Sequence, residues 1–268
     1  MADLSITALY TSQVWAWAKL PCAELCATRD AKRVFDVTNA ALALARKPPL
    51  KFALLHRHAM IDHLVRASEV HRVIELAAGL SRRGAAMSRE LDYTEVDLPA
   101  MIAKKRELLD RSVEGRAARD RMHLVAGDAT TLELAPLAIA APTMVIAEGL
   151  AMYLARPVRR ALFERVRVLA DTTRELHFVF DLVPRGDEPP PGLAGRVLER
   201  AMKRFTGGQG FERDAASRDD VQDELRRAGF ADVRAYSSRE VAAAWHLPHG
   251  ERATTMIVFS ARARASRA

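Results

Sequence analysis

The segment VIELAAGLSRRG, residues 73–84, constrains the fold of this chain more than any other. It indicates a short buried strand over 73–76, a turn of small residues and the start of a helix. A second strand-like run, DYTEVDLP, contains Asp97, eighteen residues after Gly79. This order of strand, turn, helix and strand predicts a parallel sheet in which helical crossovers connect neighbouring strands.

The turn after the first expected strand lacks the G-x-G-x-x-G pattern that brings backbone amides close to a pyrophosphate. It supplies Glu75 and one conformationally free glycine, Gly79. A carboxylate at the tip of the next strand, here Asp97, can accept hydrogen bonds from two vicinal ribose hydroxyls. Glu95, one pleat earlier, is the alternative ribose ligand. These features favour a nucleoside cofactor without phosphates, of which S-adenosylmethionine is the common example.

From residue 71 onward, apolar runs typical of buried strands alternate with segments of helical spacing. We therefore predict an α/β fold with a Rossmann-like sheet of seven strands, most of them parallel. The expected strands cover 71–76, 91–97, 122–126, 142–147 and 175–181, followed by DVRAYSS and TTMIVFSA, which are close enough to pair antiparallel. The expected helices between and after them cover 81–90, 99–110, 156–170 and 217–228.

Residues 1–70 indicate a helical N-terminal extension in front of a domain that spans 71–268. One helix of the extension should start with Asp30 as its N-cap and bury an apolar stripe. The residues of this stripe are Val34, Val37, Ala41 and Leu44. Within the domain, the stretch from about 184 to 216 begins rich in Pro and Gly and interrupts the alternation, which predicts an inserted lid.

The formal net charge is +7, from 41 Lys and Arg against 34 Asp and Glu. The basic residues are scattered beside acidic ones along the expected helices, so we expect no nucleic-acid partner. No apolar run approaches the roughly 18 residues that span a bilayer, and no signal peptide is recognisable. We therefore expect a cytoplasmic protein with no membrane partner. The cysteines and histidines lack metal-ligand spacing, so no metal site is expected.

Acidic residues occur at the ends of four successive expected strands. Glu75 belongs to the first, Asp97 ends the second, Asp128 follows the third and Glu148 follows the fourth. Because the carboxyl ends of parallel strands border one crevice, these acids should gather around one ligand. Carboxylates packed together disfavour ionisation, so a cationic ligand is expected. S-adenosylmethionine carries a sulfonium, an ammonium and ribose hydroxyls.

Four segments together resemble the leucine carboxyl methyltransferase superfamily, notably its bacterial branch of polyketide O-methyltransferases. They are VIELAAGLSRRG, YTEVDLPAMIAKKRELL, VAGDATTL and VIAEGLAMYL. The combination of E-x-D-L-P, followed by Lys, with E-G-L-x-M-Y-L carries the resemblance, which extends from SITALYTSQVWAW to the terminal strands. The resemblance implies a class I methyltransferase fold, S-adenosylmethionine as the cofactor and a small-molecule methyl acceptor.

The resemblance also implies roles for individual residues. It places Gly79 against the methionine part of the cofactor and Asp97 on the ribose. It places Asp128 and Ala129 at the adenine, and Glu148 near the amino-acid end of the cofactor.

The cofactor carboxylate is assigned by the same resemblance to Arg57, on the helix before the first strand. His58 follows it, where the family often has Thr. Ser81 and Arg82 stand where members with protein substrates often have Asp and Thr. This departure favours the small-molecule branch.

Tyr153 and His177 are the two candidates for a catalytic base. A carboxylate acceptor is already ionised near neutral pH, whereas a phenol, with a pKa near about 10, would benefit from a base. We predict an S-adenosylmethionine-dependent O-methyltransferase for a small carboxylate or phenol, with a polyketide as one candidate. Two alternatives stay open. One is methylation of a protein C-terminal leucine carboxylate, and the other is a non-catalytic member that binds cofactor or a partner.

Overall fold

The computed structural model describes residues 6–182, 217–254 and 256–265. Within them the chain forms a seven-stranded sheet with the order β3-β2-β1-β4-β5-β7-β6. The strands are β1 (Arg72–Leu76), β2 (Asp92–Asp97), β3 (Met122–Ala126), β4 (Thr143–Ala147), β5 (Leu176–Asp181), β6 (Ala231–Ser237) and β7 (Ile257–Ala263). Each strand overlaps a predicted one, and the mostly parallel α/β sheet is confirmed.

The strand order changes direction at β1, which pairs in parallel with β2 on one side and β4 on the other. β7 is antiparallel to both of its neighbours, β5 and β6. Where the order of a parallel sheet reverses, successive connections leave to opposite faces and a crevice opens outside the carboxyl ends of the strands. The topology therefore predicts a ligand crevice at the ends of β1 and β4.

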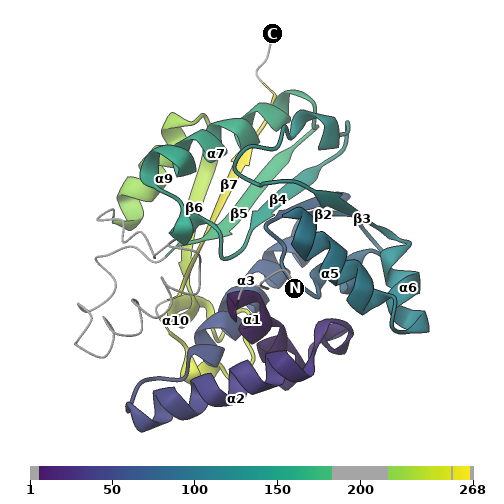
Figure 1. The fold of residues 1–268 in the computed structure, drawn as a ribbon. Coiled ribbons are helices and arrows are strands. Elements are labelled where there is room, and N and C mark those ends of the chain that lie inside the picture. The colour runs from purple at the N-terminus through teal and green to yellow at the C-terminus, as the bar shows by residue number, and fades with distance from the viewer. Residues whose placement is uncertain (1–5, 183–216, 255, 266–268) are drawn as a thin grey trace.

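Helices cover both faces of the sheet (Figure 1). α7 and α9 share a core with one face, which includes the stacked rings of Phe178 and Phe180. α4 and α5 pack on the opposite face. The bounds of the helices after β1 are α4 (Arg83–Met87), α5 (Pro99–Leu109), α6 (Val113–Arg119), α7 (Arg156–Val168), α9 (Arg218–Arg227) and α10 (Ser238–Val241). Of these, α6 and α10 had no counterpart in the sequence prediction.

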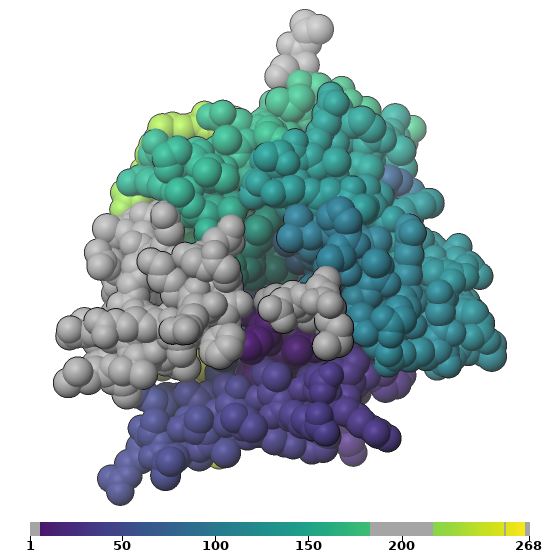
Figure 2. Space-filling view, viewed as in Figure 1, coloured from purple at the N-terminus to yellow at the C-terminus, as the bar shows by residue number. Residues whose placement is uncertain are grey.

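Within the described residues, three α-helices precede the sheet: α1 (Ile6–Trp17), α2 (Arg29–Leu44) and α3 (Leu50–Arg66). α3 packs on the sheet, where Met60 and Ile61 share a core with the inner face of β1 and β4. α1 and α2 pack on each other and on the start of α3. Figure 2 shows these N-terminal helices, in purple, forming the lower part of the molecule. The last helix before residue 71 therefore belongs to the same core as the sheet.

The stripe predicted for α2 is wrong at Val37, Ala41 and Leu44, which are exposed, while Val34 does pack against the core. Val37 is 70% exposed and Leu44 is 89% exposed, whereas the buried residues of α2 are Ala31 and Phe35. Phe35 stacks on Tyr10 of α1, with ring centroids 5.4 Å apart, and this contact turns a different face of α2 inward. The N-cap is Thr28, whose hydroxyl accepts a hydrogen bond from the backbone N–H of Ala31; the prediction of Asp30 is also wrong.

The predicted lid at about 184–216 lies outside the described residues. Among the residues that are described, no helix is both long enough and apolar enough to cross a membrane. Among the described residues, the strand ends and the turns that follow them border the expected crevice, together with α1 and α3.

The packing of α2 predicts opposite outcomes for two apolar positions. Phe35→Ala should lower the free energy of unfolding by about 3–5 kcal/mol, because it removes a buried ring and leaves a cavity. Leu44→Ala should change it by less than about 0.5 kcal/mol, because the side chain is already in solvent. Urea unfolding followed by circular dichroism measures both. Equal losses in the two variants would contradict the orientation of α2.

Candidate cofactor site

The carboxyl ends of the parallel strands bring three acids together at one end of the sheet, which we call the cofactor edge. The register pairs Leu76 with Val96, and Ala147 with Phe180. These buried residues form one row across the sheet. The next residue in the chain is an acid after Val96, Ala147 and Phe180, namely Asp97, Glu148 and Asp181. Asp181 was not among the predicted site residues, although it ends the fifth predicted strand in the same way.

The turn between β1 and α4 is held by Asp97. The backbone N–H of Gly79 donates to one carboxylate oxygen at 2.6 Å, and the N–H of Leu98 donates to the other at 2.7 Å. Burial raises the pKa of Asp97, while these two donors oppose the shift. Ala77 and Gly79 both have positive φ, of 53° and 55°, so the turn is tight. Asp97 thus fixes the backbone at the point that was predicted to face the cofactor.

α1 lies over this turn. A Cβ built on Gly79 would be 3.7 Å from the Cβ of Ala8, so the backbone of the turn and the first part of α1 are neighbours. Tyr153, in the 3-10 turn Ala151–Tyr153 after β4, interacts with Thr7 of the same helix. α1 therefore contacts both sides of the switch point.

Arg83 is the centre of a buried network below the edge. Its Nε donates to Asp62 at 2.7 Å, Nη1 donates to Glu75 at 2.5 Å and Nη2 donates to Glu148 at 2.7 Å. Arg83 is fully buried, and burial opposes its charge, but the carboxylates around it raise its pKa. Arg82, next to it, also pairs with Asp62. One arginine thereby joins α3, β1 and the end of β4.

Arg57 of α3 shares Glu148 with Arg83 and also pairs with Asp181. Its Nε donates to Glu148 at 2.9 Å and its Nη1 donates to Asp181 at 3.3 Å. The N–H of Gly149 donates to the other oxygen of Asp181 at 2.5 Å. Gly149 has φ +70°, and a Cβ there would lie 3.3 Å from the guanidinium of Arg57. The predicted neighbours Arg57 and Glu148 are therefore in direct contact.

His58 completes the contacts of Glu148. Its Nδ1 lies 2.9 Å from a Glu148 oxygen, and its ring stands edge-on to Trp15 at 4.5 Å between centroids. Burial and the charge of Arg83 lower the pKa of His58 far below its ordinary value, so the imidazole is neutral. Although burial opposes ionisation, the hydrogen bond with His58 and the charges of Arg57 and Arg83 hold the pKa of Glu148 well below its usual range. Glu148 is therefore ionised.

Glu75 and Glu95 lie inside the protein. Glu75 accepts hydrogen bonds from the hydroxyl of Tyr93 at 2.6 Å and from Ser81 at 3.3 Å, besides that from Arg83. Glu95 is fully buried against Lys105. Both side chains are engaged away from the edge, which leaves Asp97 as the acid of β2 that reaches it.

Asp128 and Ala129 follow β3 at the same end of the sheet. One oxygen of Asp128 accepts hydrogen bonds from the backbone N–H of Thr130 at 2.8 Å and from its hydroxyl at 2.7 Å. These bonds lower the pKa of Asp128, which is exposed, whereas Ala129 is buried. The pair offers a carboxylate beside an apolar surface.

The structure separates the two candidate bases. Tyr153 lies near Arg57 and Asp181, and burial raises the pKa of its phenol. His177 is the second residue of β5, four residues before Asp181, so it lies about 13 Å along the strand from the edge. The structure therefore does not bring His177 together with the strand-end acids.

Four residues of the network were missed from the sequence. They are Asp62, Arg82, Arg83 and Asp181. The available signal was SRRG, two adjacent arginines in an otherwise apolar strand-to-helix turn beside a predicted buried acid. Among the described residues, no group of three or more His, Cys, Asp or Glu side chains is arranged to hold a metal ion.

The fold and this edge define a class I methyltransferase, and comparison with known families agrees. The sequence matches the leucine carboxyl methyltransferase family over residues 12–167, which is 156 of its 268 residues. The chain belongs to this family. Membership confirms the resemblance drawn from the sequence motifs and supports S-adenosylmethionine as the cofactor. The comparison with curated proteins finds no match.

Solved structures share the fold at low sequence identity. A protein from Nostoc punctiforme assigned as an O-methyltransferase has a TM-score of 0.54 and 16% identity, over 80% of this chain and 60% of that one. The S-adenosylmethionine-dependent methyltransferase SibL has a TM-score of 0.52 and 16% identity, over 94% of this chain and 62% of that one. The glycopeptide N-methyltransferase MtfA in complex with S-adenosylmethionine has a TM-score of 0.50 and 20% identity, over 77% of this chain and 86% of that one. The chain thus spans less than two thirds of the first of these proteins.

The network predicts that Arg83 is structurally essential. Arg83→Leu should lower the free energy of unfolding by about 3–5 kcal/mol, because it leaves buried carboxylates without their partner. Arg89→Leu is the matched control, since Arg89 is exposed six residues later. Thermal and urea unfolding measure both variants. A stability of Arg83→Leu within about 0.5 kcal/mol of the wild type would contradict the role of Arg83.

Proposed function

We propose that the protein transfers a methyl group from S-adenosylmethionine to an oxygen of a small organic acid or phenol, with polyketides as candidate acceptors. The observation that carries the proposal is the edge itself, where ionised groups meet at the switch point of a methyltransferase fold. The family match supports the reaction class.

The charge of the network suits this cofactor. Four buried acids, Asp62, Glu75, Glu148 and Asp181, face three buried arginines, Arg57, Arg82 and Arg83. The buried groups alone, four negative against three positive, hold one negative charge in excess, while the exposed Arg66 lies 3.7 Å from Asp62 at the margin of the network. S-adenosylmethionine, with a sulfonium and an ammonium against one carboxylate, carries one net positive charge and would balance it. Buried nitrogens of Trp15 and His58 without partners among the described residues add polar capacity beside Glu148.

The adenosine half of the cofactor would lie along the ends of β2 and β3. Each oxygen of a carboxylate can accept more than one hydrogen bond. Asp97 can therefore bind two ribose hydroxyls while it still holds Gly79 and Leu98. Asp128 would accept from the adenine amino group, with Ala129 against the ring.

The methionine half would lie between the β1 turn and Arg57. Gly79 would pass closest to it. Arg57 contacts Asp181 at 3.3 Å and Glu148 at 2.9 Å, so its contact with Asp181 is the longer one. The cofactor carboxylate would approach the guanidinium on the side that faces Asp181. Glu148, held ionised, would face the ammonium.

When bound, S-adenosylmethionine supplies a methyl carbon on a sulfonium, which passes to the acceptor oxygen while the C–S electron pair stays on sulfur. A carboxylate acceptor needs no base, and alignment of the two reactants supplies much of the acceleration. Tyr153 is protonated at neutral pH because burial raises its pKa, so it would donate a hydrogen bond to the acceptor rather than take a proton. We propose no role for His177 in transfer at this edge.

Methylation of a protein C-terminal carboxylate is the second candidate, because the family is described by that reaction. A third candidate is a member that binds the cofactor without transferring its methyl group. Incubation of the enzyme with methyl-deuterated cofactor and host extract, split into small-molecule and protein fractions, distinguishes the three. Label in small molecules supports the proposal, label at protein C-termini supports the second candidate, and binding without label supports the third.

Asp97 should contribute strongly to cofactor binding. Asp97→Ala should weaken the binding of S-adenosylhomocysteine about 10- to 150-fold, the range for hydrogen bonds to a charged group. Asp110→Ala, at the exposed end of α5, is the control and should bind normally. Isothermal titration calorimetry measures the affinities. Wild-type affinity in Asp97→Ala, together with a loss in Glu95→Gln, would move the ribose site to Glu95.

The product should be a methyl ester. The edge offers an ionised acceptor a sulfonium and Arg57 as counter-charges, whereas it offers a phenol no neutral base close by among the described residues other than His58, which is buried. Mild alkali should therefore release the transferred label as volatile methanol. A product that resists alkali would identify an aryl ether and overturn the carboxylate assignment.

A further inference from the structure

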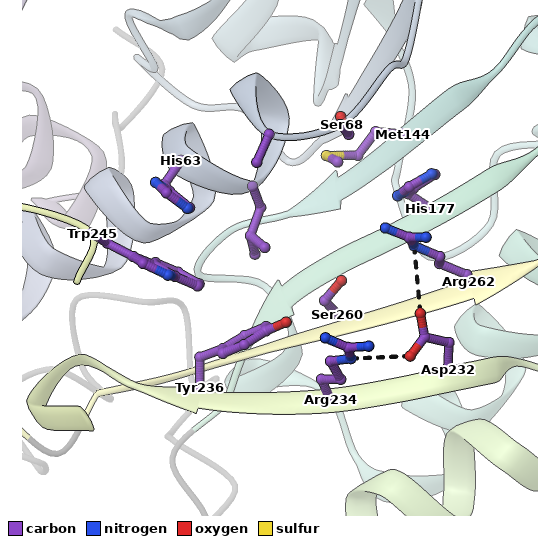
Figure 3. Close-up of a pocket in the computed structure, with 12 residues that line it drawn as sticks. His63, Ser68, Met144, His177, Asp232, Arg234, Tyr236, Trp245, Ser260 and Arg262 are labelled. Atoms are coloured by element: carbon purple, nitrogen blue, oxygen red, sulfur yellow. Dashed lines mark hydrogen bonds and ion pairs between the residues drawn. The ribbon is translucent and has the colours of Figure 1, made fainter. Parts of the chain in front are cut away.

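A pocket of 180 Å³ lies on the inner face of the sheet, away from the cofactor edge (Figure 3). Its floor includes Met144 and His177, which pair side by side as the second residues of β4 and β5. Both lie four rows before the edge, about 13 Å away along an extended strand. The pocket and the cofactor edge are thus at opposite ends of the same strands.

The pocket exists because α3 ends before it covers this part of the sheet. Further along β7, Val258 is fully buried in the core beneath α3. Beyond the last turn of α3, the same strand presents Ser260 and Arg262 to the pocket. Here the strand reaches the surface, since the side chain of Arg262 is 50% exposed. The polar side chains and the open volume together form a candidate ligand site.

One wall of the pocket is a rigid aromatic surface. Trp245 stacks on His63 of α3, with ring centroids 4.2 Å apart and planes within 12°. It also contacts Tyr236 of β6 at 4.8 Å. Figure 3 shows Trp245 and Tyr236 side by side at one end of the pocket. His63 covers one face of the indole and Tyr236 contacts it from β6, so a planar ligand ring would meet the ordered part of the indole that these two neighbours leave uncovered.

The other wall is cationic. Arg234 donates to Asp232 at 3.0 Å, whereas Arg262 approaches Asp232 only to 3.7 Å and Glu175 only to 3.9 Å. At those distances Arg262 has ion pairs but no short hydrogen bond to either acid, so its N–H groups can serve a ligand. Burial lowers the pKa of His177, so its imidazole adds no charge at neutral pH.

Size and charge together define the ligand. Two arginines against one aspartate give the lining a net charge of +1. The volume slightly exceeds the roughly 150 Å³ of a cavity that holds benzene. Arginine binds carboxylates through paired hydrogen bonds. We propose that this pocket is a second ligand site, which binds a monocyclic aromatic carboxylate with its ring against Trp245 and its carboxylate on Arg262.

Benzoate is the probe, titrated by calorimetry into the full chain with and without saturating S-adenosylhomocysteine. We expect benzoate to bind in both cases with the same affinity, because the two sites are separate. Cyclohexanecarboxylate should bind less tightly, since it lacks the planar ring. No benzoate binding, displacement by S-adenosylhomocysteine, or sulfate binding as tight as that of benzoate would each overturn the proposal.

Two variants test the walls. Arg262→Gln should weaken benzoate binding at least about 10-fold, as expected for loss of a charged hydrogen-bond partner. Trp245→Leu should weaken it as well, whereas Arg226→Gln, at an exposed position on α9, should not. Thermal unfolding and S-adenosylhomocysteine binding confirm that each variant is folded. Unchanged benzoate affinity in both wall variants would overturn the proposal, while failure of the cofactor assignment alone would leave the benzoate result intact.

Discussion

The guanidinium of Arg83 is the interaction on which the rest of this architecture depends. It binds acids from α3, from β1 and from the residue after β4, and it has no exposure to solvent. A buried charge is tolerated only with well-placed partners, and removal of one partner leaves the others uncompensated. Arg83 therefore ties α3 to the sheet and stabilises Glu75 and Glu148 beside each other.

The same pairing explains how the edge can be both stable and receptive. Acids collected there without cations would become protonated, because like charges disfavour ionisation. The arginines keep Glu148 ionised while they leave one charge unbalanced. Asp97 solves a different problem, since it braces the backbone of the β1 turn with the same carboxylate that a ribose would use. The carboxylate oxygens of Asp97 would thus both support the turn and bind the ligand.

The sheet could be predicted almost completely, because most strands are short apolar runs between turns and strand periodicity is a local property; β6, ADVRAYS, is the polar exception. The edge acids Asp97, Asp128 and Glu148 were predictable for the same reason, as strand ends are visible in sequence. The partners of buried charges were not, since Asp62 and Arg83 meet only in three dimensions. The buried face of α2 was predicted wrongly for the same reason. An apolar stripe does not reveal which helix will cover it, and here the contact of Phe35 with Tyr10 of α1 determines which face is buried.

The contact between Arg57 and Asp181 spans 124 residues of chain, and that between Arg57 and Glu148 spans 91. Contacts between residues so distant in sequence close long loops before they contribute stability, and they slow folding. α3 leaves the ribosome early, yet its arginine finds its last partner only after β5 has been synthesised. α3 therefore completes its contacts only when the strands that end at Glu148 and Asp181 are in place.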